Sequence, residues 1–409
     1  MTRTTWVEEQ VTKFCAAPLT LETTFLRSMY WRGTLQRELC DLLLALRGEG
    51  IVLSLKSQED PTVRRGTELA AWCGKAAKKA AAQLGGAMRT VRQETFFCQH
   101  PRRGLVQFAP AQITVRHGIA VLEAQTDVVK LPDGLPDAAY GAPFTYFSLN
   151  DALNVVTELR AFPDLTAYLD ARLKLPLAVR RIIGKERLLY QYYLLNDETF
   201  DGCQSLEYAA SFVKARENEF KERLKAKLTL DQYTRMVEHV SDALATRAPD
   251  YAVGLDPATL AGFDSDTNRK NYLRLQEELC GLRLVARRNL GEAFDRVHRK
   301  VAESRKLQDM VYCAILFDEK PDFLYVLAAS RGIERQKLLS RTRFTLNGAL
   351  AWYRVRQEMA LVDRDGAGYE VCLTELKHPT DTDIKAGQEL FGTLRMMTIA
   401  ARTLPAHGN

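Results

Sequence analysis

Two opposite charges interrupt the apolar stretch ELCDLLLALRGEGIVLSLKS, residues 38–57. Asp41 stands inside the first apolar run, and Lys56 ends the second. Burying an ionised group without a partner costs several kcal/mol, so a buried aspartate must be paired, metal-bound or protonated. The residues by themselves leave three alternatives open: an ion pair at the end of a sheet, an exposed edge strand, or a site where a carboxylate and an ammonium act together.

Both apolar runs are short and rich in Leu, Val and Ile. Gly48 and Gly50 separate them, a pattern typical of two buried strands joined by a tight turn. With Gly48 and Glu49 as a two-residue loop, Asp41 lies directly opposite Lys56, and their β-carbons are about 5 Å apart. The hairpin therefore predicts that the two charges meet on one face of a sheet.

The pleat of the second strand decides which other side chains share that face. Because side chains alternate with a period of two, Ser54 and Gln58 lie on the same side as Lys56. A three-residue loop would instead place Asp41 opposite Ser57. The meeting of the two charges therefore depends on the length of the turn.

The elements that must position these strands alternate between helix and strand. Apolar periodicity predicts helices over 6–15, 21–30 and 66–88. Further strands are expected at 105–108, 113–115, 119–124 and 128–131, with a turn at 116–118. Residues 1–150 are therefore expected to form a first domain of mixed α and β structure.

The rest of the chain divides into two further regions. Residues 151–305 show helical spacing almost throughout, with one long helix from 267 to about 306 that would bridge domains or make a coiled contact. Residues 306–409 return to alternation, with strands at 311–317, 323–328, 359–362 and 369–374 and a helix at 335–355. The expected fold class is α+β or α/β, with a helical middle domain and a C-terminal α/β domain.

Over roughly residues 20–130, the order of these parts resembles the PD-(D/E)xK, or restriction-endonuclease-like, nuclease superfamily. A helix with an acid is followed by a strand with an aspartate, a turn, a strand ending in x-K, and a basic helix. Within that superfamily it is similar to nuclease-related domains of uncharacterised bacterial proteins. The resemblance implies a restriction-endonuclease-like domain at 1–150 and a metal-dependent endonuclease that hydrolyses phosphodiester bonds of DNA. By analogy alone, it also implies a role in bacterial anti-phage defence.

In that family a strand aspartate and the acid of the (D/E)-x-K strand bind magnesium, while the lysine positions and activates the attacking water. Asp41 matches the first acid and Lys56 the lysine. Ser54 departs from the pattern, because the second strand reads S-L-K where the family has an acid. Another acid must then complete the metal site, and the candidates are Glu38 and, on the preceding helix, Glu22.

Magnesium takes oxygen ligands, usually one or two carboxylates together with water and phosphate, so Asp41 alone would bind Mg²⁺ or Mn²⁺ weakly. Glu38 is preferred to Glu22 as the second acid, although a regular strand would place Glu38 on the face opposite Asp41. Ser54 offers a neutral oxygen to the metal, and Gln58 would hold the water or a phosphate. The metal and the neighbouring lysine would stabilise the negative charge that develops during hydrolysis.

A cluster of basic residues follows this hairpin. Arg64 and Arg65 precede the third expected helix, which carries Lys75, Lys78 and Lys79. The first and last of these lysines lie one helical turn apart, so they form a cationic strip suited to a nucleic-acid backbone. The alternative is an ordinary solvated helix face.

Composition sets limits on the partners. The chain has 409 residues, a net charge of +6 and a pI near 8.8, short of the value above about 9 typical of a dedicated nucleic-acid-binding domain. Its opening residues are charged where a signal peptide needs an apolar core, and no run of 18 apolar residues occurs, so we expect a cytoplasmic protein without a membrane partner. Eight dispersed cysteines without a C-x-x-C pair are expected to be reduced.

Two alternatives to the nuclease remain. The missing acid at Ser54 is compatible with a catalytically inactive, nuclease-like subunit that binds nucleic acid or assembles with a protein partner. The long helix is compatible with a structural adaptor that forms a homo-oligomer. The chain has no P-loop, Rossmann glycine pattern, G-x-S-x-G elbow or H-E-x-x-H sequence, so ATPase, dehydrogenase and common hydrolase functions have no support.

Overall fold

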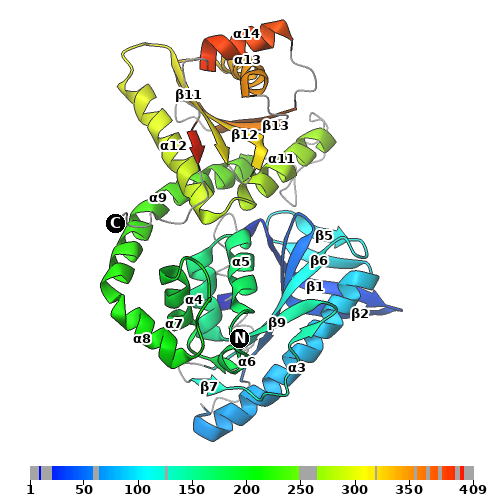
Figure 1. Ribbon diagram of the computed structural model, residues 1–409. Coiled ribbons are helices and arrows are strands. Elements are labelled where there is room, and N and C mark those ends of the chain that lie inside the picture. Colours follow the sequence, from blue (N-terminus) through cyan, green and yellow to red (C-terminus); the bar gives the residue numbers. More distant parts are fainter. Residues whose placement is uncertain are drawn as a thin grey trace. The chain divides into compact units, whose positions relative to one another are not determined.

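The computed structural model describes residues 9–10, 21–58, 64–124, 128–247, 265–317, 320–353, 357–364, 369–375, 380–391 and 397–399 (Figure 1). The chain is mixed α+β, as expected, and it divides into two compact units. The first comprises Met1–Lys225 with Tyr251–Leu255, and the second comprises Ala226–Asp250 with Asp256–Asn409. Neither expected boundary, at 150 or at 305, coincides with this division.

The first unit is built on a mixed eight-stranded sheet with the strand order β5-β4-β1-β2-β3-β6-β9-β8. The strands are β1 (Thr24–Arg32), β2 (Leu35–Leu46), β3 (Glu49–Lys56), β4 (Phe96–His100), β5 (Gly104–Phe108), β6 (Thr114–Leu122), β8 (Ala138–Ala139) and β9 (Ala142–Ser148). Neighbours β1, β2 and β3 are antiparallel, whereas β3, β6 and β9 run parallel. The carboxyl ends of β3 and β6 therefore meet at one edge of the sheet.

Helices cover both faces at the middle of this sheet (Figure 1). The connection from β3 contains α3 (Gly66–Gln93), whose buried alanines pack on β2, β3 and β6. On β2, Leu43 belongs to the core beneath α3, while the next residue, Leu44, lines a small cavity with residues of α4 (Leu149–Leu159) and α5 (Phe162–Arg172). Burial on both faces explains why β2 and β3 read as almost unbroken apolar runs.

Two predictions for this unit are wrong. The helix expected at 21–30 is strand β1, because pairing with β2 and β4 outweighs a weak helical periodicity. The turn expected at 116–118 lies inside β6. Gly118 is there because α3 and β9 approach closely: a β-carbon at this position would lie 2.7 Å from Met88 and 2.9 Å from Phe144.

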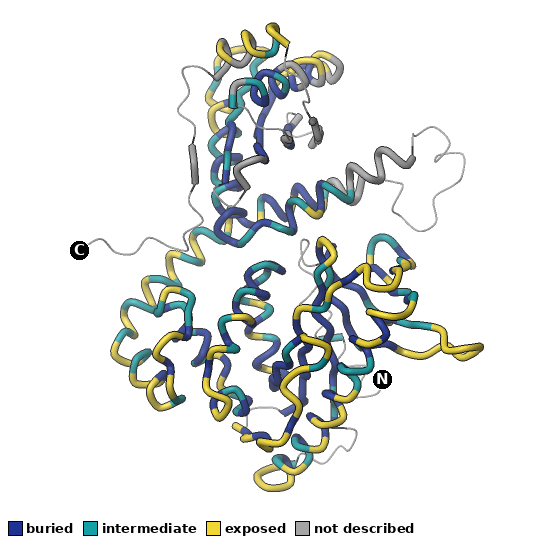
Figure 2. Tube along the Cα trace, turned by 45° about the vertical axis from the view of Figure 1, so that its right-hand side comes forward, coloured by how far each residue is buried: buried dark blue, intermediate teal, exposed yellow. Residues whose placement is uncertain are grey.

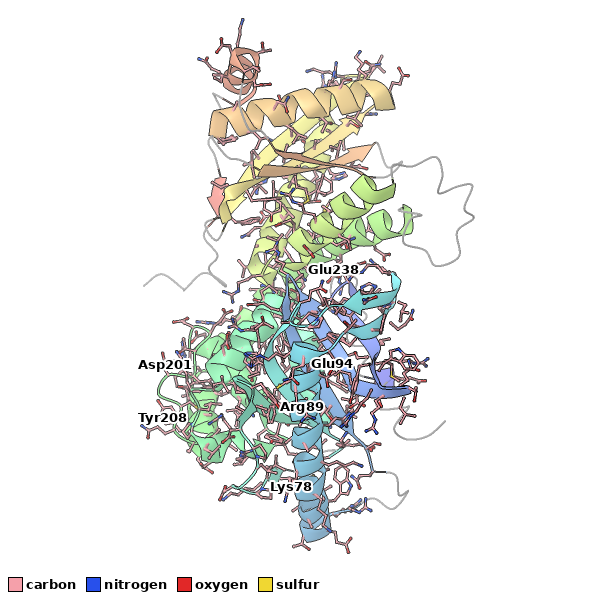
Figure 3. The ribbon with its side chains drawn as sticks, turned by 90° about the vertical axis from the view of Figure 1, so that its right-hand side faces the viewer. Lys78, Arg89, Glu94, Asp201, Tyr208 and Glu238 are labelled. Atoms are coloured by element: carbon pink, nitrogen blue, oxygen red, sulfur yellow. The ribbon has the colours of Figure 1, made fainter. Side chains whose placement is uncertain are left out.

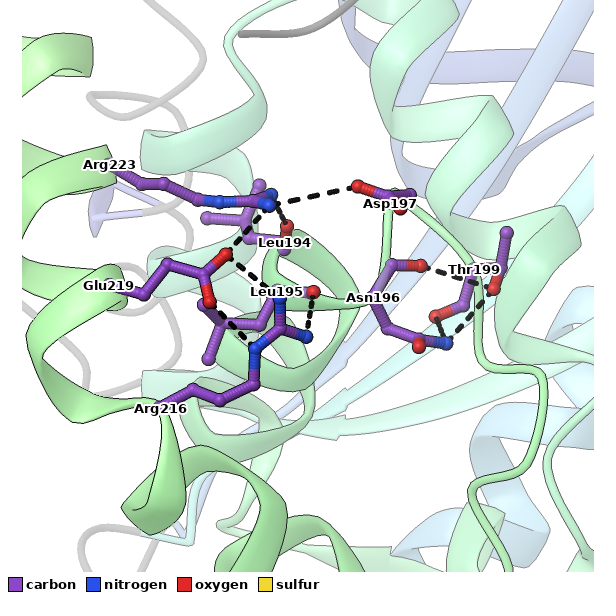
Figure 4. Close-up of polar contacts among 8 residues, drawn as sticks. All are labelled: Leu194, Leu195, Asn196, Asp197, Thr199, Arg216, Glu219 and Arg223. Atoms are coloured by element: carbon purple, nitrogen blue, oxygen red, sulfur yellow. Dashed lines mark hydrogen bonds and ion pairs between the residues drawn. The ribbon is translucent and has the colours of Figure 1, made fainter. Parts of the chain in front are cut away.

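Beyond the sheet, the unit continues as α6 (Leu177–Arg180), α7 (Glu186–Leu195), α8 (Leu206–Ala215) and the start of α9 (Glu217–Arg247), with a small sheet of β7 (Val129–Lys130) and β10 (Ile182–Ile183). Two arginines satisfy the end of α7 (Figure 4). Arg216 and Arg223 each donate to a terminal carbonyl, those of Leu195 and Leu194, over 2.5 Å. Glu219 pairs with both arginines, so the α7 end is fixed to α9.

The second unit contains a five-stranded sheet in the order β14-β13-β12-β11-β15. Its elements are α11 (Ser265–Cys280), α12 (Leu284–Glu303), β11 (Asp309–Phe317), β12 (Lys320–Arg331), α13 (Arg335–Tyr353), β13 (Gln357–Arg364), β14 (Tyr369–Glu375), α14 (Asp381–Phe391) and β15 (Met397–Ile399). The strands and the helix expected from 311 to 374 are confirmed. The single long helix from 267 is wrong, because Arg283 adopts an extended conformation and separates α11 from α12.

Candidate functional site

The loop of the β2–β3 hairpin consists of Arg47 and Gly48, which both have left-handed φ angles, 52° and 78°. Positive φ at both central residues is the geometry that two-residue hairpins favour. The expected loop, which included Glu49, is wrong by one residue. Continued along the strands, the observed register places Asp41 opposite Ser54 rather than opposite the lysine.

The two charges nevertheless meet, because the register differs from the expected one by two residues and the face is unchanged. Lys56 Nζ lies 4.0 Å from Asp41 Oδ2. The same carboxylate oxygen accepts a hydrogen bond from the backbone N–H of Leu55 over 2.6 Å. The backbone of β3 therefore fixes the orientation of the aspartate.

A glutamine from α3 joins this pair. The amide oxygen of Gln83 accepts hydrogen bonds from Lys56 Nζ over 2.6 Å and from Ser54 Oγ over 2.9 Å. Asp41, Ser54, Lys56 and Gln83 together are called the polar cluster below. Sequence reasoning missed Gln83, although its spacing from Ala76 and Ala80 predicts that it shares their buried helix face.

The polar cluster is only partly shielded from water. Ser54 is fully buried, but the side chains of Asp41 and Lys56 are 10% and 15% exposed. Asp41 Oδ1 has no hydrogen-bond partner among the described residues. One carboxylate oxygen and one ammonium are therefore within reach of a ligand at the edge of the sheet.

A second polar contact joins the ends of β3 and β6. Gln58 donates from its backbone N–H to Glu123 Oε2 and from its side chain to the Glu123 carbonyl, both over 2.8 Å. The Glu123 N–H donates to the Lys56 carbonyl over 2.9 Å. Gln58 thus lies against Glu123. Arg64 Nη1 donates a hydrogen bond to the side-chain amide oxygen of Gln58 over 3.3 Å. Sequence reasoning also missed Glu123, which was detectable as an acid directly after a buried parallel strand.

The structure does not bring Glu38 into the polar cluster. Glu38 is exposed and lies opposite Met29 in the ladder between β1 and β2. By strand alternation it shares a face with Gln36, which lines an open pocket together with Met29. The bulge between Glu38 and Asp41 therefore leaves these two acids at separate places along β2.

Glu22 lies elsewhere as well. The carbonyl of the next residue, Thr23, accepts a hydrogen bond from Ala45 at the turn end of β2, four residues or about 13 Å along the strand from Asp41. The Glu22 carboxylate is bound by Arg102 over 2.8 Å. It therefore belongs to the loop between β4 and β5 and not to the polar cluster.

Cys40, next to Asp41 in the chain, and His100, at the end of β4, are both held neutral. Burial raises the pKa of the Cys40 thiol well above its usual value. Burial and the nearby guanidinium of Arg103 lower the pKa of His100 to about 3. Neither group therefore offers a thiolate or a charged imidazole near neutral pH.

The polar cluster contains one carboxylate, that of Asp41, as a candidate metal ligand. Magnesium sites use one or two carboxylates and complete their shell with water and substrate oxygens. Asp41 supplies one such carboxylate, and Glu123 is the residue after Leu122, which pairs with Lys56 on the adjacent strand. Within the described ranges, no group of three or more His, Cys, Asp or Glu side chains is arranged to hold a metal ion.

The expected basic strip lies along α3. Lys75, Lys78 and Lys79 are exposed there, and so is Arg65 at the residue before the helix. Arg89, further along α3, is also exposed, and Figure 3 shows it and Lys78 on this helix. The helix therefore presents a predominantly cationic outer surface.

Comparisons of the chain with protein-family models, curated proteins and solved structures found no match.

Among the residues that the structure describes, no helix combines the length and the apolar character needed to cross a bilayer. Among the described residues, the free cysteines include Cys313 and five buried ones, Cys40, Cys73, Cys98, Cys203 and Cys280.

Proposed function

We propose that the first unit is a metal-dependent nuclease module that hydrolyses phosphodiester bonds of DNA. One observation supports this above all: Asp41, Lys56 and Gln83, which come from three different elements, converge at the carboxyl end of β3. Asp41 and Lys56 are the two residues that match the PD-(D/E)xK pattern. A partly buried lysine next to a carboxylate with a free oxygen has the components needed to bind a cation and a phosphate.

Each residue of the polar cluster has a distinct role in this proposal. Asp41 Oδ1 binds the metal, while the Leu55 N–H holds the other carboxylate oxygen in place. When bound, Mg²⁺ or Mn²⁺ lowers the pKa of a coordinated water and supplies positive charge to the phosphate. Lys56 Nζ donates to the attacking water or to a phosphate oxygen. Gln83 keeps that ammonium beside the carboxylate.

We assign the second acid to Glu123 in preference to Glu38 and Glu22. Its backbone N–H is hydrogen-bonded to the Lys56 carbonyl, so it lies at the same end of the sheet as the polar cluster. Glu38 lies further out on β2, and Glu22 is bound by Arg102. Ser54 has a structural role, because its hydroxyl is buried and donates to Gln83.

The decisive experiment is cleavage of single- and double-stranded DNA and RNA by the purified full chain, with Mn²⁺ or with EDTA. We expect metal-dependent cleavage that Lys56→Ala and Asp41→Asn lower by about 100-fold or more while DNA binding is retained. Lys174→Ala is the matched control, since Lys174 is 61% exposed. EDTA-resistant cleavage, or full activity of Lys56→Ala, would contradict the proposal.

The second acid is tested in the same assay. Glu123→Gln keeps the size of the side chain and removes its charge, so we expect a higher Mn²⁺ requirement and weaker cleavage. Glu38→Gln should behave like the wild type. The reverse result would transfer the role to Glu38.

A second candidate function is nucleic-acid binding without catalysis. It is favoured by the buried serine at the usual position of an acid, and by hydrogen bonds that already occupy Ser54 and Lys56 within the polar cluster. In that case the same assay would give salt-dependent DNA binding and no cleavage with any divalent metal. The role in bacterial defence remains part of the proposal by analogy only.

A further inference from the structure

The hairpin of β1 and β2 extends beyond the end of β3. Continued along the strands, the register places Leu39 opposite Lys56, so residues 35–38 of β2 and their partners 29–32 of β1 lie past that end. These two segments are called the outer ribbon. Figure 2 shows the outer ribbon as largely exposed. Its base therefore lies beside the polar cluster, and its length projects from the sheet.

An open pocket of about 390 Å³ lies where the outer ribbon adjoins β4 and β5. It is called the ribbon pocket. Trp31 and Phe97 supply aromatic rings, and Arg27, Gln36 and Gln99 supply polar groups, while Met29 and Leu105 complete an apolar floor. Trp31 is 54% exposed and Leu105 is 70% exposed. Large apolar groups this exposed are typical of binding surfaces.

The polar groups of the ribbon pocket are available to a ligand. Arg27, Gln36 and Gln99 have no side-chain hydrogen bond or ion pair with another described residue. The backbone at Arg27 has a left-handed φ of 46° at a β-bulge between β1 and its neighbours. Arg27 and Met29 are two residues apart on β1, and both line the ribbon pocket.

The charge near the ribbon pocket suits a polyanion. Three arginines lie on β1 and the outer ribbon, Arg27, Arg32 and Arg37, against one acid, Glu38. Aromatic rings flanked by arginine and amide groups are the means by which proteins bind unpaired bases: the rings stack, the amides reach base edges and the guanidinium binds phosphate. A paired base keeps its faces stacked within the duplex and cannot use such rings.

We propose that the ribbon pocket binds an unpaired segment of nucleic acid, whose bases stack on Trp31 and Phe97 and whose phosphates lie on Arg27. This rests on the proposed function for the identity of the polymer. The outer ribbon begins beside Lys56, but the side chains that line the ribbon pocket lie on the face of the sheet opposite α3 and the polar cluster. The favoured ligand is a single-stranded region of DNA, such as an end, a flap or a melted duplex.

The test is the binding of a fluorescein-labelled oligothymidylate to the full chain in EDTA, where no metal-dependent cleavage occurs. We expect Trp31→Ala to raise the Kd about tenfold, in line with the loss of a base–aromatic stack. Trp31→Phe should bind nearly as the wild type does, since a ring remains. Tyr208→Ala is the control, because Tyr208 is a half-exposed aromatic residue on α8.

Tryptophan fluorescence gives an independent signal in the same titration. Stacking on Trp31 should quench the emission of the wild type, and Trp31→Phe should lose this quenching while it retains binding. Unchanged strand affinity of Trp31→Ala overturns the inference. Two other results also overturn the inference. In the first, Trp31→Ala loses affinity for blunt duplex DNA alone; in the second, the wild type binds an unstructured peptide more tightly than it binds the single strand.

The outcome is separable from that of the proposed function. If Lys56→Ala abolishes cleavage and Trp31→Ala binds the strand like the wild type, the nuclease proposal holds and the ribbon pocket inference fails. If Trp31→Ala weakens strand binding and no protein cleaves with any metal, the inference holds and the catalytic proposal fails.

Discussion

Gln83 is the residue that holds the polar cluster together, since its amide oxygen accepts from both Lys56 and Ser54. Asp41 alone would not fix the lysine, because their charged atoms are 4.0 Å apart. At this scale the sequence identified the two charges but not the neutral group between them. The helical spacing of Gln83 places it on the face of the buried alanines, but which groups it contacts there depends on how the helix docks on the sheet.

At the residue scale we predict different consequences for the two neutral partners. Gln83→Leu removes the acceptor of the buried Ser54 hydroxyl and of the partly buried Lys56 ammonium, so it should lower the free energy of unfolding by about 1–3 kcal/mol and also weaken cleavage. Ser54→Ala removes one donor and should cost about 1 kcal/mol with cleavage unchanged. Urea denaturation and the metal-dependent cleavage assay measure the two effects. Lost cleavage in a stable Ser54→Ala protein would assign Ser54 to the metal.

At the scale of elements, the turn between β4 and β5 is organised around a neutral histidine. His100 Nδ1 accepts the backbone N–H groups of Arg102 and Arg103 over 3.1 and 3.0 Å, and Nε2 lies 3.1 Å from the Glu22 carbonyl. Protonation of Nδ1 would abolish both accepted bonds. This turn holds Glu22 and the start of β1 in place, so Glu22 has a structural role.

This arrangement predicts a dependence of stability on pH. The pKa of His100 is about 3 in the folded chain and about 6.5 in the unfolded chain, so the unfolded state binds the proton more readily between these values. Stability is therefore full above pH 6.5 and falls as the pH drops, by up to about 1.4 kcal/mol per pH unit from this group. Burial lowers the pKa of His117 as well, which acts in the same direction.

Urea unfolding at pH 7.5, 6 and 5 measures this dependence. His100→Gln lacks the titrating ring, so its stability should fall less steeply between pH 6 and 5 than that of the wild type. Equal slopes for the two proteins would show that His100 is not responsible.

At the scale of the whole molecule, the net charge of +6 is modest, but α3 concentrates part of it in one row. We predict that DNA affinity falls steeply with salt and that joint replacement of Lys75, Lys78 and Lys79 by Gln reduces the slope of log K against log [salt] by up to about 2–3. Fluorescence anisotropy at 50–200 mM salt measures the slope. Lys221→Gln is the control, and an unchanged slope in the triple variant would identify the row as a solvated helix face.

The sequence predicted the helices and strands of the second unit more accurately than those of the first. In the second unit, the buried runs of β11 and β12 and the helix after them were recognisable, because each is a long, uniform local pattern. In the first unit, the helix expected at 21–30 was wrong, since β1 exists only through its pairing with β2 and β4. Local periodicity in a sequence does not reveal a strand's pairing partner when that partner is distant in the chain.

The sequence by itself determined that Asp41 and Lys56 share a face, because strand side chains alternate with a period of two and an error of two residues in register leaves the face unchanged. It also located β2, β3 and the basic helix, and it placed the turn between the two strands to within one residue. Only the tertiary structure decided which groups complete the site. Gln83 lies 27 residues from Lys56, and Glu123 lies 65 residues from Gln58. Contacts over such separations depend on how α3 and β6 pack on β3, and no spacing along the chain records that packing.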